Sequence, residues 1–415
     1  MLKTVHRVLR SLQTPRPAGR QRSRPTPIDP LEQKILPVAN VSFNGAALNI
    51  TSDTSNNNIR VERVGTELRV AGQGGTLINV LGTNVTEYFF PLGGAFNLTA
   101  KFSDGNDQLR VVGGLQLKSA NISMGDGIIN EVTVHGATLS GKLTINGGNG
   151  TNFFVIEQTS VTSSTVINTG WHSDGVTLID STFVGATTIK TNLGSDQVTI
   201  LSTGASRTKF VGKLTIDTGE DADTVLLRGL ETKAFSINTG DGGDVVTIED
   251  VLTNGPISVK TGGGVDGLTL TEVIHSGTGA IAIDLGADFD GLFLNTCTFS
   301  GATTLNLGGG GTTCLIDDAS FNGAFTLTTK GVFDQIRIET NTAATGETTF
   351  RKAAVFNLGL QNAVVFGAAD AASSTRFLSS VSLTGKNPLS TLTVTVANVS
   401  FLSPPILKNV TRIDV

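Results

Sequence analysis

The residues of this sequence best suited to chemistry are aspartates that recur on glycine-rich turns. The phrases TGDGGDVVTIED at 239–250, TGGGVDGLTLTE at 261–272 and LGADFDGLFLNT at 285–296 carry them. Carboxylates and backbone carbonyls on tight turns are the oxygen ligands that calcium prefers. Because equivalent acids of successive repeats would lie near one another, the pattern predicts a calcium site. The predicted ligands are the recurring Asp223, Asp244, Asp266 and Asp290, together with the neighbouring Asp221, Asp241 and Asp288.

In other repeats, the position of the recurring aspartates is occupied by residues that are weaker calcium ligands. Asn130, Asn152 and Asn362 occupy it, and so does Thr312. All of these side chains can hydrogen-bond backbone groups in a turn, and stacked carboxylates would repel one another. Turn capping therefore stands beside calcium binding as an alternative interpretation.

One of the phrases is similar to the calcium-binding nonapeptide of bacterial toxin repeats, Gly-Gly-x-Gly-x-Asp-x-apolar-x. Gly240, Gly242, Asp244 and Val246 match four of its fixed positions. That family repeats every nine residues and shares each ion between consecutive turns, whereas the phrase here appears once in about 22 residues. The resemblance implies calcium at these turns, and the different period separates the chain from that family.

The elements that must position these residues follow from the repeat itself. Each repeat has an anchor residue, the last Asp, Asn or Thr before a predicted strand, and most anchors are 21 to 24 residues apart. A fixed period in this range is typical of a solenoid, in which each repeat buries its apolar face against its neighbours. The gap between residues 57 and 107 fits two coils. The anchor residues are Asn57, Asp107, Asn130, Asn152, Asp174, Asp196, Asp223, Asp244, Asp266, Asp290, Thr312, Asp334 and Asn362.

Alternating apolar residues define the strands of each repeat. Positions two and four after the anchors are apolar, as at Val246 and Ile248, which predicts a strand with one face inward. A second short strand ends each repeat, and Phe183, Phe299 and Phe321 mark a third inward position nine residues after the anchor. This pattern predicts an all-β, single-stranded parallel β-helix (a β-solenoid) with coils of about 22 residues. The general preference of parallel crossovers makes it right-handed.

The repeat divides the chain into three predicted parts. Residues 39–375 form the parallel β-helix, and residues 376–415, which depart from the phrase, form a C-terminal β cap of the same solenoid. Longer intervals predict loops that bulge at 203–211 and 340–353. Residues 1–38, rich in Arg, Pro, Gln and Ser, are predicted to be a disordered basic arm.

The end of this arm reads Leu31-Glu32-Gln33-Lys34-Ile35-Leu36-Pro37. It resembles the short N-terminal segment of many large secreted or surface proteins of planctomycete bacteria, which often reads Leu-Glu-Asp-Arg-Leu-x-Pro. Gln33 and Lys34 stand where Asp and Arg are commoner. The resemblance implies export and an extracellular or cell-envelope location.

Composition limits the partners. The formal net charge of −5 combines about +6 in residues 1–37 with about −11 in the remainder. An acidic body argues against a nucleic-acid groove, so no nucleic-acid partner is expected.

No stretch of the sequence approaches the roughly 18 apolar residues of a transmembrane segment. The two cysteines of the chain cannot form a disulfide framework. Cys314 falls at an inward position and is expected to pack as a small hydrophobe.

An enzyme would need acids or bases gathered on an outward face, and the sequence offers few. The outward position three residues after the anchor holds mostly Thr, Val and Leu, which are β-formers rather than acid–base pairs. No two histidines share a station, and His275 takes the inward place of a Phe. The best catalytic arrangement places calcium on Asp223 and Asp244, with Arg228 as the base. Parallel β-helix polysaccharide lyases and hydrolases, which the chain resembles in coil length, suggest this alternative.

We therefore expect an extracellular or cell-envelope β-helix with a structural or adhesive role as an interaction scaffold. Its expected partners are extracellular polysaccharide or envelope and matrix proteins. An outward apolar patch of Leu226, Phe293 and Leu315 predicts lateral self-association. Trp171 and Tyr88 are the aromatic candidates for a sugar platform. The alternative is a polysaccharide-active enzyme, either a calcium-assisted lyase or a glycoside hydrolase.

Overall fold

The computed structural model describes residues 36–204, 206–340, 346–367, 374–394 and 398–415. Residues 1–35, which carry most of the predicted basic arm and of the planctomycete-like segment, lie outside the described residues. Residues 341–345 of the predicted loop at 340–353 lie outside them as well. Every regular element in the described ranges is a β-strand. These ranges contain no helix with the length and apolar character needed to cross a membrane.

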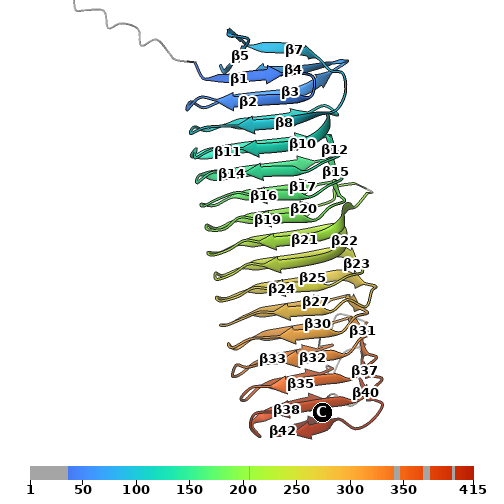
Figure 1. The fold of residues 1–415 in the computed structure, drawn as a ribbon. Helices are drawn as coiled ribbons and strands as arrows, with labels where there is room; N and C mark the ends of the chain where they lie inside the picture. The colour runs from blue at the N-terminus through green and yellow to red at the C-terminus, as the bar shows by residue number, and fades with distance from the viewer. Residues whose placement is uncertain (1–35, 205, 341–345, 368–373, 395–397) are drawn as a thin grey trace, which may run out of the picture. The chain divides into compact units, whose positions relative to one another are not determined.

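About 14 coils lie one upon another in the solenoid, roughly 22 residues apart (Figure 1). Neighbouring coils pair mostly in parallel, and each residue faces its equivalent one coil away, as Val176 faces Val198. The prediction of an all-β parallel solenoid is therefore confirmed. Because the register repeats, each station of the sequence becomes a column along the stack.

Sheet I collects the strands that follow the anchor residues. Their burial alternates strictly, as in β17, where Val176 and Leu178 point inward between half-exposed neighbours. This alternation is what a strand with one buried face requires. The strands of sheet I alone are β3 (Asn58–Val64), β9 (Gln108–Val112), β11 (Ile129–His135), β14 (Thr151–Glu157), β17 (Gly175–Ile179), β20 (Gln197–Leu201), β27 (Gly291–Asn295), β30 (Thr313–Asp317), β33 (Gln335–Ile338), β36 (Ala363–Phe366), β39 (Ser390–Val394) and β42 (Val410–Asp414).

A corner ladder of short strands follows sheet I in each coil. Its inward residue is most often Phe, and the rings stack coil upon coil, with Phe321 and Phe350 centred 4.9 Å apart. Phe can fill this column without a polar atom to satisfy. The corner strands are β12 (Thr138–Leu139), β15 (Ser160–Val161), β18 (Thr182–Phe183), β28 (Thr298–Phe299), β31 (Ser320–Phe321), β34 (Glu347–Phe350), β37 (Ser374–Phe377) and β40 (Val399–Phe401).

Sheet II closes each coil before the next glycine-rich turn. Five strands turn the corner: β10 (Gln116–Ser123) and β21 (Thr208–Asp217) run from the corner into sheet II, β23 (Val245–Thr253) and β25 (Gly267–His275) run from sheet I into the corner, and β22 (Thr224–Asn238) runs through all three. The separate strands of sheet II are β2 (Ala47–Ser52), β8 (Phe96–Lys101), β13 (Leu143–Asn146), β16 (Thr165–Asn168), β19 (Thr187–Lys190), β24 (Ile257–Lys260), β26 (Ile281–Asp284), β29 (Thr303–Asn306), β32 (Phe325–Thr328), β35 (Ala354–Leu358), β38 (Val381–Gly385) and β41 (Ile406–Lys408).

The N-terminal end of the stack differs from the rest, because antiparallel pairs cover it. β1 (Val38–Phe43) pairs antiparallel with β2, and β4 (Glu67–Gly72) with both β3 and β7 (Glu87–Pro91). β5 (Leu77–Val80) and β6 (Thr83–Val85) form a further hairpin.

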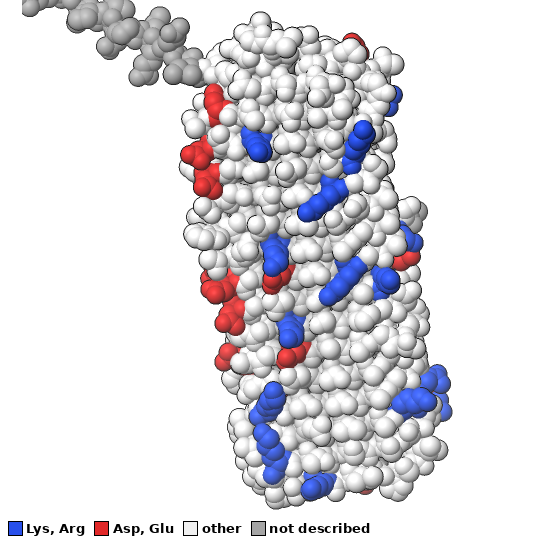
Figure 2. All heavy atoms as spheres, in the orientation of Figure 1, with Lys and Arg blue, Asp and Glu red and all other residues white. Residues whose placement is uncertain are grey.

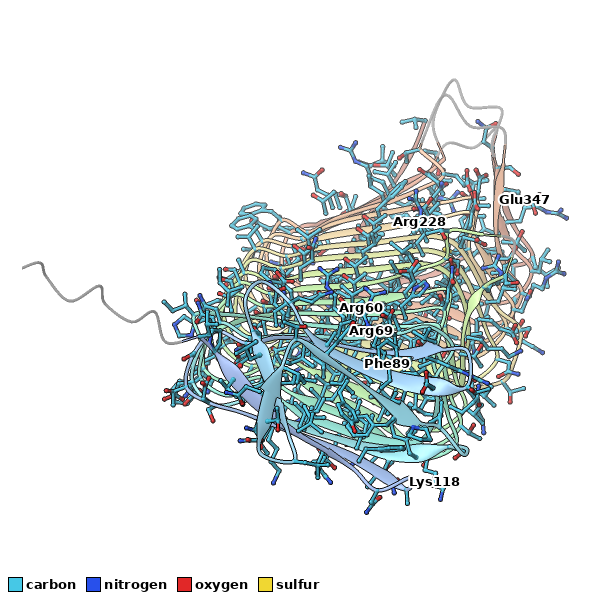
Figure 3. The ribbon with its side chains drawn as sticks, turned by 90° about the horizontal axis from the view of Figure 1, so that it is seen from above. Arg60, Arg69, Phe89, Lys118, Arg228 and Glu347 are labelled. Atoms are coloured by element: carbon cyan, nitrogen blue, oxygen red, sulfur yellow. The ribbon has the colours of Figure 1, made fainter. Side chains whose placement is uncertain are left out.

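The assignment of two coils to the gap between Asn57 and Asp107 is wrong. Asp107 Oδ1 accepts the Asn57 N–H at 2.7 Å, so these two anchors belong to adjacent coils, and the residues between them form the hairpins and strand β8 of sheet II. The pairs Arg60–Glu62 and Arg69–Glu87 lie on these hairpins, near the end seen in Figure 3.

The segment predicted as a cap carries strands in the same order as the coils before it. β37, β38 and β39 pair in parallel with β34, β35 and β36. β40, β41 and β42 then pair with β37, β38 and β39 in turn. The columns of the solenoid thus extend through the described residues of this segment.

Candidate functional site

The anchor column lies on the buried side of the turns. The aspartate side chains of this column accept backbone N–H groups of the neighbouring anchors: Asp244 Oδ1 accepts the N–H of Asp223 at 2.8 Å, and Asp266 Oδ1 accepts that of Asp244 at 2.9 Å. Asp290 Oδ1 continues the ladder at 3.0 Å from the N–H of Asp266. The structure thus brings the four recurring aspartates of the predicted calcium site into one column. All four are buried.

The second carboxylate oxygen of these residues is buried without a donor of its own. In Asp174, Asp196 and Asp223, Oδ2 lacks a hydrogen-bond partner among the described residues. A threonine five residues earlier lies close enough to lower the pKa of each carboxyl, but its single hydroxyl hydrogen serves the next coil. Thr191 Oγ1, for example, donates to the carbonyl of Thr218 at 3.1 Å.

Burial dominates the pKa of these carboxyls, because the charged form loses its water. It raises the pKa of Asp196 and Asp290 to about 7 and that of Asp174 and Asp223 to about 6. It also raises the pKa of Asp244. A protonated Oδ2 could donate to the threonine hydroxyl beside it, which would complete the hydrogen bonding of the column.

The other three aspartates of the predicted calcium site lie elsewhere on the turns. Asp221, Asp241 and Asp288 are exposed, and Asp288 Oδ2 accepts the N–H of Gly264 at 3.2 Å. Figure 2 shows acidic side chains gathered along one edge of the stack, with Lys and Arg spaced over the face beside it. The described ranges contain no group of three or more His, Cys, Asp or Glu residues arranged to hold a metal ion. Calcium binding stays a prediction, divided between a buried and an exposed set.

Two further predicted residues occupy the core. His275 is fully buried in the corner column, where its Nε2 lies 3.0 Å from the carbonyl oxygen of Gly255, and burial lowers its pKa. Cys314 is buried and free at an inward position of β30, as expected, and Cys297 is buried and free as well. None of the three offers a reactive group to solvent.

The remaining candidates lie on outward faces. Arg228, the proposed base, forms an ion pair with Glu249 at 2.9 Å and is 57% exposed (Figure 3). In the predicted lateral patch, Phe293 and Leu315 face each other on adjacent coils, whereas Leu226 lies three coils from Phe293, with Thr247 and Thr269 between them. The structure therefore assembles only part of that patch.

A groove at the corner was not singled out by the sequence pattern. It has a volume of about 590 Å³ and crosses four consecutive coils at equivalent positions. Val211 and Ile274 are 44% and 46% exposed there, which is high for apolar side chains in strands. The lining residues are Lys209, Phe210, Val211, Glu231, Thr232, Lys233, Leu252, Thr253, Asn254, Ile274 and Ser276.

The groove lies where the stacked Phe column is interrupted. Phe183 and Phe210 stack at 5.0 Å, but Thr232 and Thr253 hold the next two inward positions of the corner. Their hydroxyls bond nearby backbone carbonyls, so they fill less volume than rings and remain satisfied. Thr in place of Phe nine residues after the anchor was the signal in the sequence.

No family model, no curated protein and no solved structure matches this chain. The class that the fold defines is the β-solenoid.

Proposed function

We propose that this β-solenoid is an extracellular or cell-envelope interaction scaffold whose corner groove holds a segment of acidic polysaccharide without cleaving it. The observation that carries the proposal is the groove shared by four coils in register. At about 4.8 Å per coil, three steps give a length of roughly 14 Å, enough for a few sugar rings in line.

The bonding of the groove strands favours a glycan over a peptide. β22 pairs in parallel with β21 on one side and with β23 on the other, so the main chain is occupied along the groove. A peptide could not add as another strand, because that mode of recognition needs a free sheet edge. Recognition would depend on side chains, and Asn254 and Ser276 offer the amide and hydroxyl that match sugar hydroxyls. Val211 and Ile274 offer apolar surface for the faces of the rings.

The charges of the groove favour an acidic glycan. Lys209 Nζ lies 2.6 Å from Glu231 Oε1, whereas Lys233 has no ion-pair partner among the described residues. Lys233 is therefore the cation of the groove without an ion-pair partner among the described residues, although the net charge of the chain is negative. A sugar carboxylate placed at Lys233 would gain a charge-assisted hydrogen bond.

The test is isothermal titration of the full chain with hexagalacturonate and, separately, with cellohexaose. We expect hexagalacturonate to bind more tightly, and Lys233→Glu to weaken it at least about tenfold, which is about 1.4 kcal/mol. Lys260→Glu is the matched control, because Lys260 is also exposed but lies on sheet II outside the groove. Equal weakening by both variants, or no binding of either sugar, would overturn the proposal.

Incubation of the full chain with the same oligosaccharides tests the enzymatic alternative. Release of shortened oligosaccharides during incubation with calcium would favour a polysaccharide-active enzyme over a passive scaffold. Loss of that release in Arg228→Gln would assign the base. The proposed export and location rest on the N-terminal resemblance alone, and fractionation of cells carrying the full gene tests them.

A further inference from the structure

A second hollow lies on the outward face of sheet I, away from the groove. Its volume is about 370 Å³, and it spans β14, β17 and β20. Phe153, Gly175 and Gln197 face one another there on three successive coils. The hollow exists because the middle residue has no side chain.

The phenyl ring of Phe153 forms one wall of this hollow. A Cβ atom added to Gly175 would come within 2.9 Å of Phe153 Cδ1, so the ring lies close against the glycine backbone. The side chain is still 47% exposed, which leaves part of the ring open to solvent. Packing against the next coil restrains the ring, and a restrained platform loses less entropy when it binds a ligand.

Apart from Asp174, which is buried in the anchor column, the polar groups of the remaining wall carry no charge. Thr151, Ser173 and Thr177 supply hydroxyls, and Gln197 supplies an amide. An aromatic surface with a few hydrogen-bonding groups around it is the usual composition of a site for a small neutral ligand. Hydroxyls and an amide can both donate and accept, as the hydroxyls of a sugar require.

We propose that this hollow binds one ring of a neutral glycan against Phe153. The site differs from the corner groove in chemistry, because no lysine or arginine lines it. It extends the proposed scaffold role to a second face of the solenoid, and it does not require the groove to bind anything. Two sites of different chemistry would let one rigid stack of coils link two kinds of glycan chain.

The chain carries its own reporter for this site. Trp171 is the single tryptophan, is 57% exposed, and lies two residues before Ser173 of the hollow. The groove begins at Lys209, on a later coil. Tryptophan emission therefore reports on the hollow, whereas heat of binding reports on both sites.

The experiment titrates the full chain with cellohexaose, xylohexaose and mannohexaose while Trp171 emission is followed. We expect at least one of them to change the emission. Phe153→Ala and Gly175→Thr should each weaken that response at least tenfold, the first by removing the ring and the second by filling the hollow. Gly267→Thr is the matched control, since Gly267 holds the same station on β25 and has nothing closer than 4.0 Å to an added Cβ.

The outcomes separate this proposal from the proposed function. No change of emission with any neutral hexasaccharide, or unchanged affinity in both Phe153→Ala and Gly175→Thr, overturns the hollow. If Phe153→Ala fails to fold, Gly175→Thr alone decides, because the added Cβ would meet only side-chain atoms of Phe153 within 4 Å and no backbone atom. Lys233→Glu should leave the Trp171 response intact, so failure of the groove and failure of the hollow give different results.

Discussion

Replacing Asp196 with asparagine is expected to stabilise the protein at pH 8 and to change little at pH 4. Asp196 is buried, and its Oδ1 accepts the N–H of Asp174 at 2.7 Å. Burial raises its pKa from 3.8 to about 7. Asn152 shows that an amide fits the same column, because its Nδ2 donates to the carbonyl of Thr169 at 2.8 Å. Asparagine would keep the acceptor and remove the charge.

The direction in which stability changes with pH follows from the proton that Asp196 retains in the folded protein. Between about pH 4 and pH 7, Asp196 is protonated in the folded state and ionised in the unfolded chain, so its contribution to stability falls as the pH rises. The difference between 3.8 and about 7 is equivalent to about 4 kcal/mol, at about 1.4 kcal/mol per pH unit. Relaxation and water penetration reduce such penalties, so the gain expected from Asp196→Asn at pH 8 is about 2 kcal/mol.

The assay is urea unfolding of the full chain at pH 4 and pH 8, monitored by circular dichroism. The slope of the free energy of unfolding against urea concentration is compared between variants. Asp241→Asn is the control, because Asp241 is exposed, and it should change the free energy of unfolding by less than about 0.5 kcal/mol at either pH. Asp196→Ala leaves the N–H of Asp174 without its acceptor and should cost about 1–3 kcal/mol at pH 4. The reasoning is refuted if Asp196→Asn has the same effect at both pH values, or destabilises the protein at pH 8.

Three further predictions address the core, a turn and calcium. Phe321→Ala should cost about 3–5 kcal/mol in urea unfolding, because its buried ring stacks 4.9 Å from the ring of the next coil; a cost below about 1 kcal/mol would contradict the stacked column. Gly240→Ala should cost at least about 3 kcal/mol or prevent folding, because φ is +90° and a Cβ would lie 1.6 Å from the carbonyl oxygen of Gly219 on the preceding coil, whereas Gly267→Ala should be tolerated. If calcium raises the melting temperature relative to excess chelator, Asp221→Asn should abolish the rise and Asp223→Asn should not, because only the first carboxylate is exposed; the reverse result would place calcium in the buried column.

The fold could be predicted because the contacts of a solenoid repeat with the sequence. Val246 and Ile248 point inward as their alternation requires, and Phe299 and Phe321 stack at the station that their spacing predicts. The count failed between Asn57 and the next anchor, where one coil with antiparallel hairpins takes the place of the two predicted coils. A repeat period gives only the number of residues between anchors, and hairpins with the same number of residues as a coil fit it equally well.

The predicted calcium site shows what spacing leaves open. Equal spacing correctly placed Asp223 and Asp244 in one column. It could not show that their Oδ1 atoms accept backbone N–H groups on the buried side, while Asp241 stays exposed on the same turn. Residues two or three apart in a turn can face opposite ways, and only the backbone dihedral angles decide which way each one faces.

The sequence alone determined the strands, the stacked Phe and anchor columns and the class of fold, because each coil packs only against its neighbours and the period states which residues are equivalent. The tertiary structure decided which outward side chains share a hollow. Phe183 pairs with Phe210 across 27 residues, so the inserted loop lengthens this coil while the corner column stays in register. Gly175 likewise becomes the floor of a hollow only because Phe153 and Gln197 lie beside it on neighbouring coils. Such contacts depend on the register between coils, and that register is fixed by packing and hydrogen bonding along the whole stack.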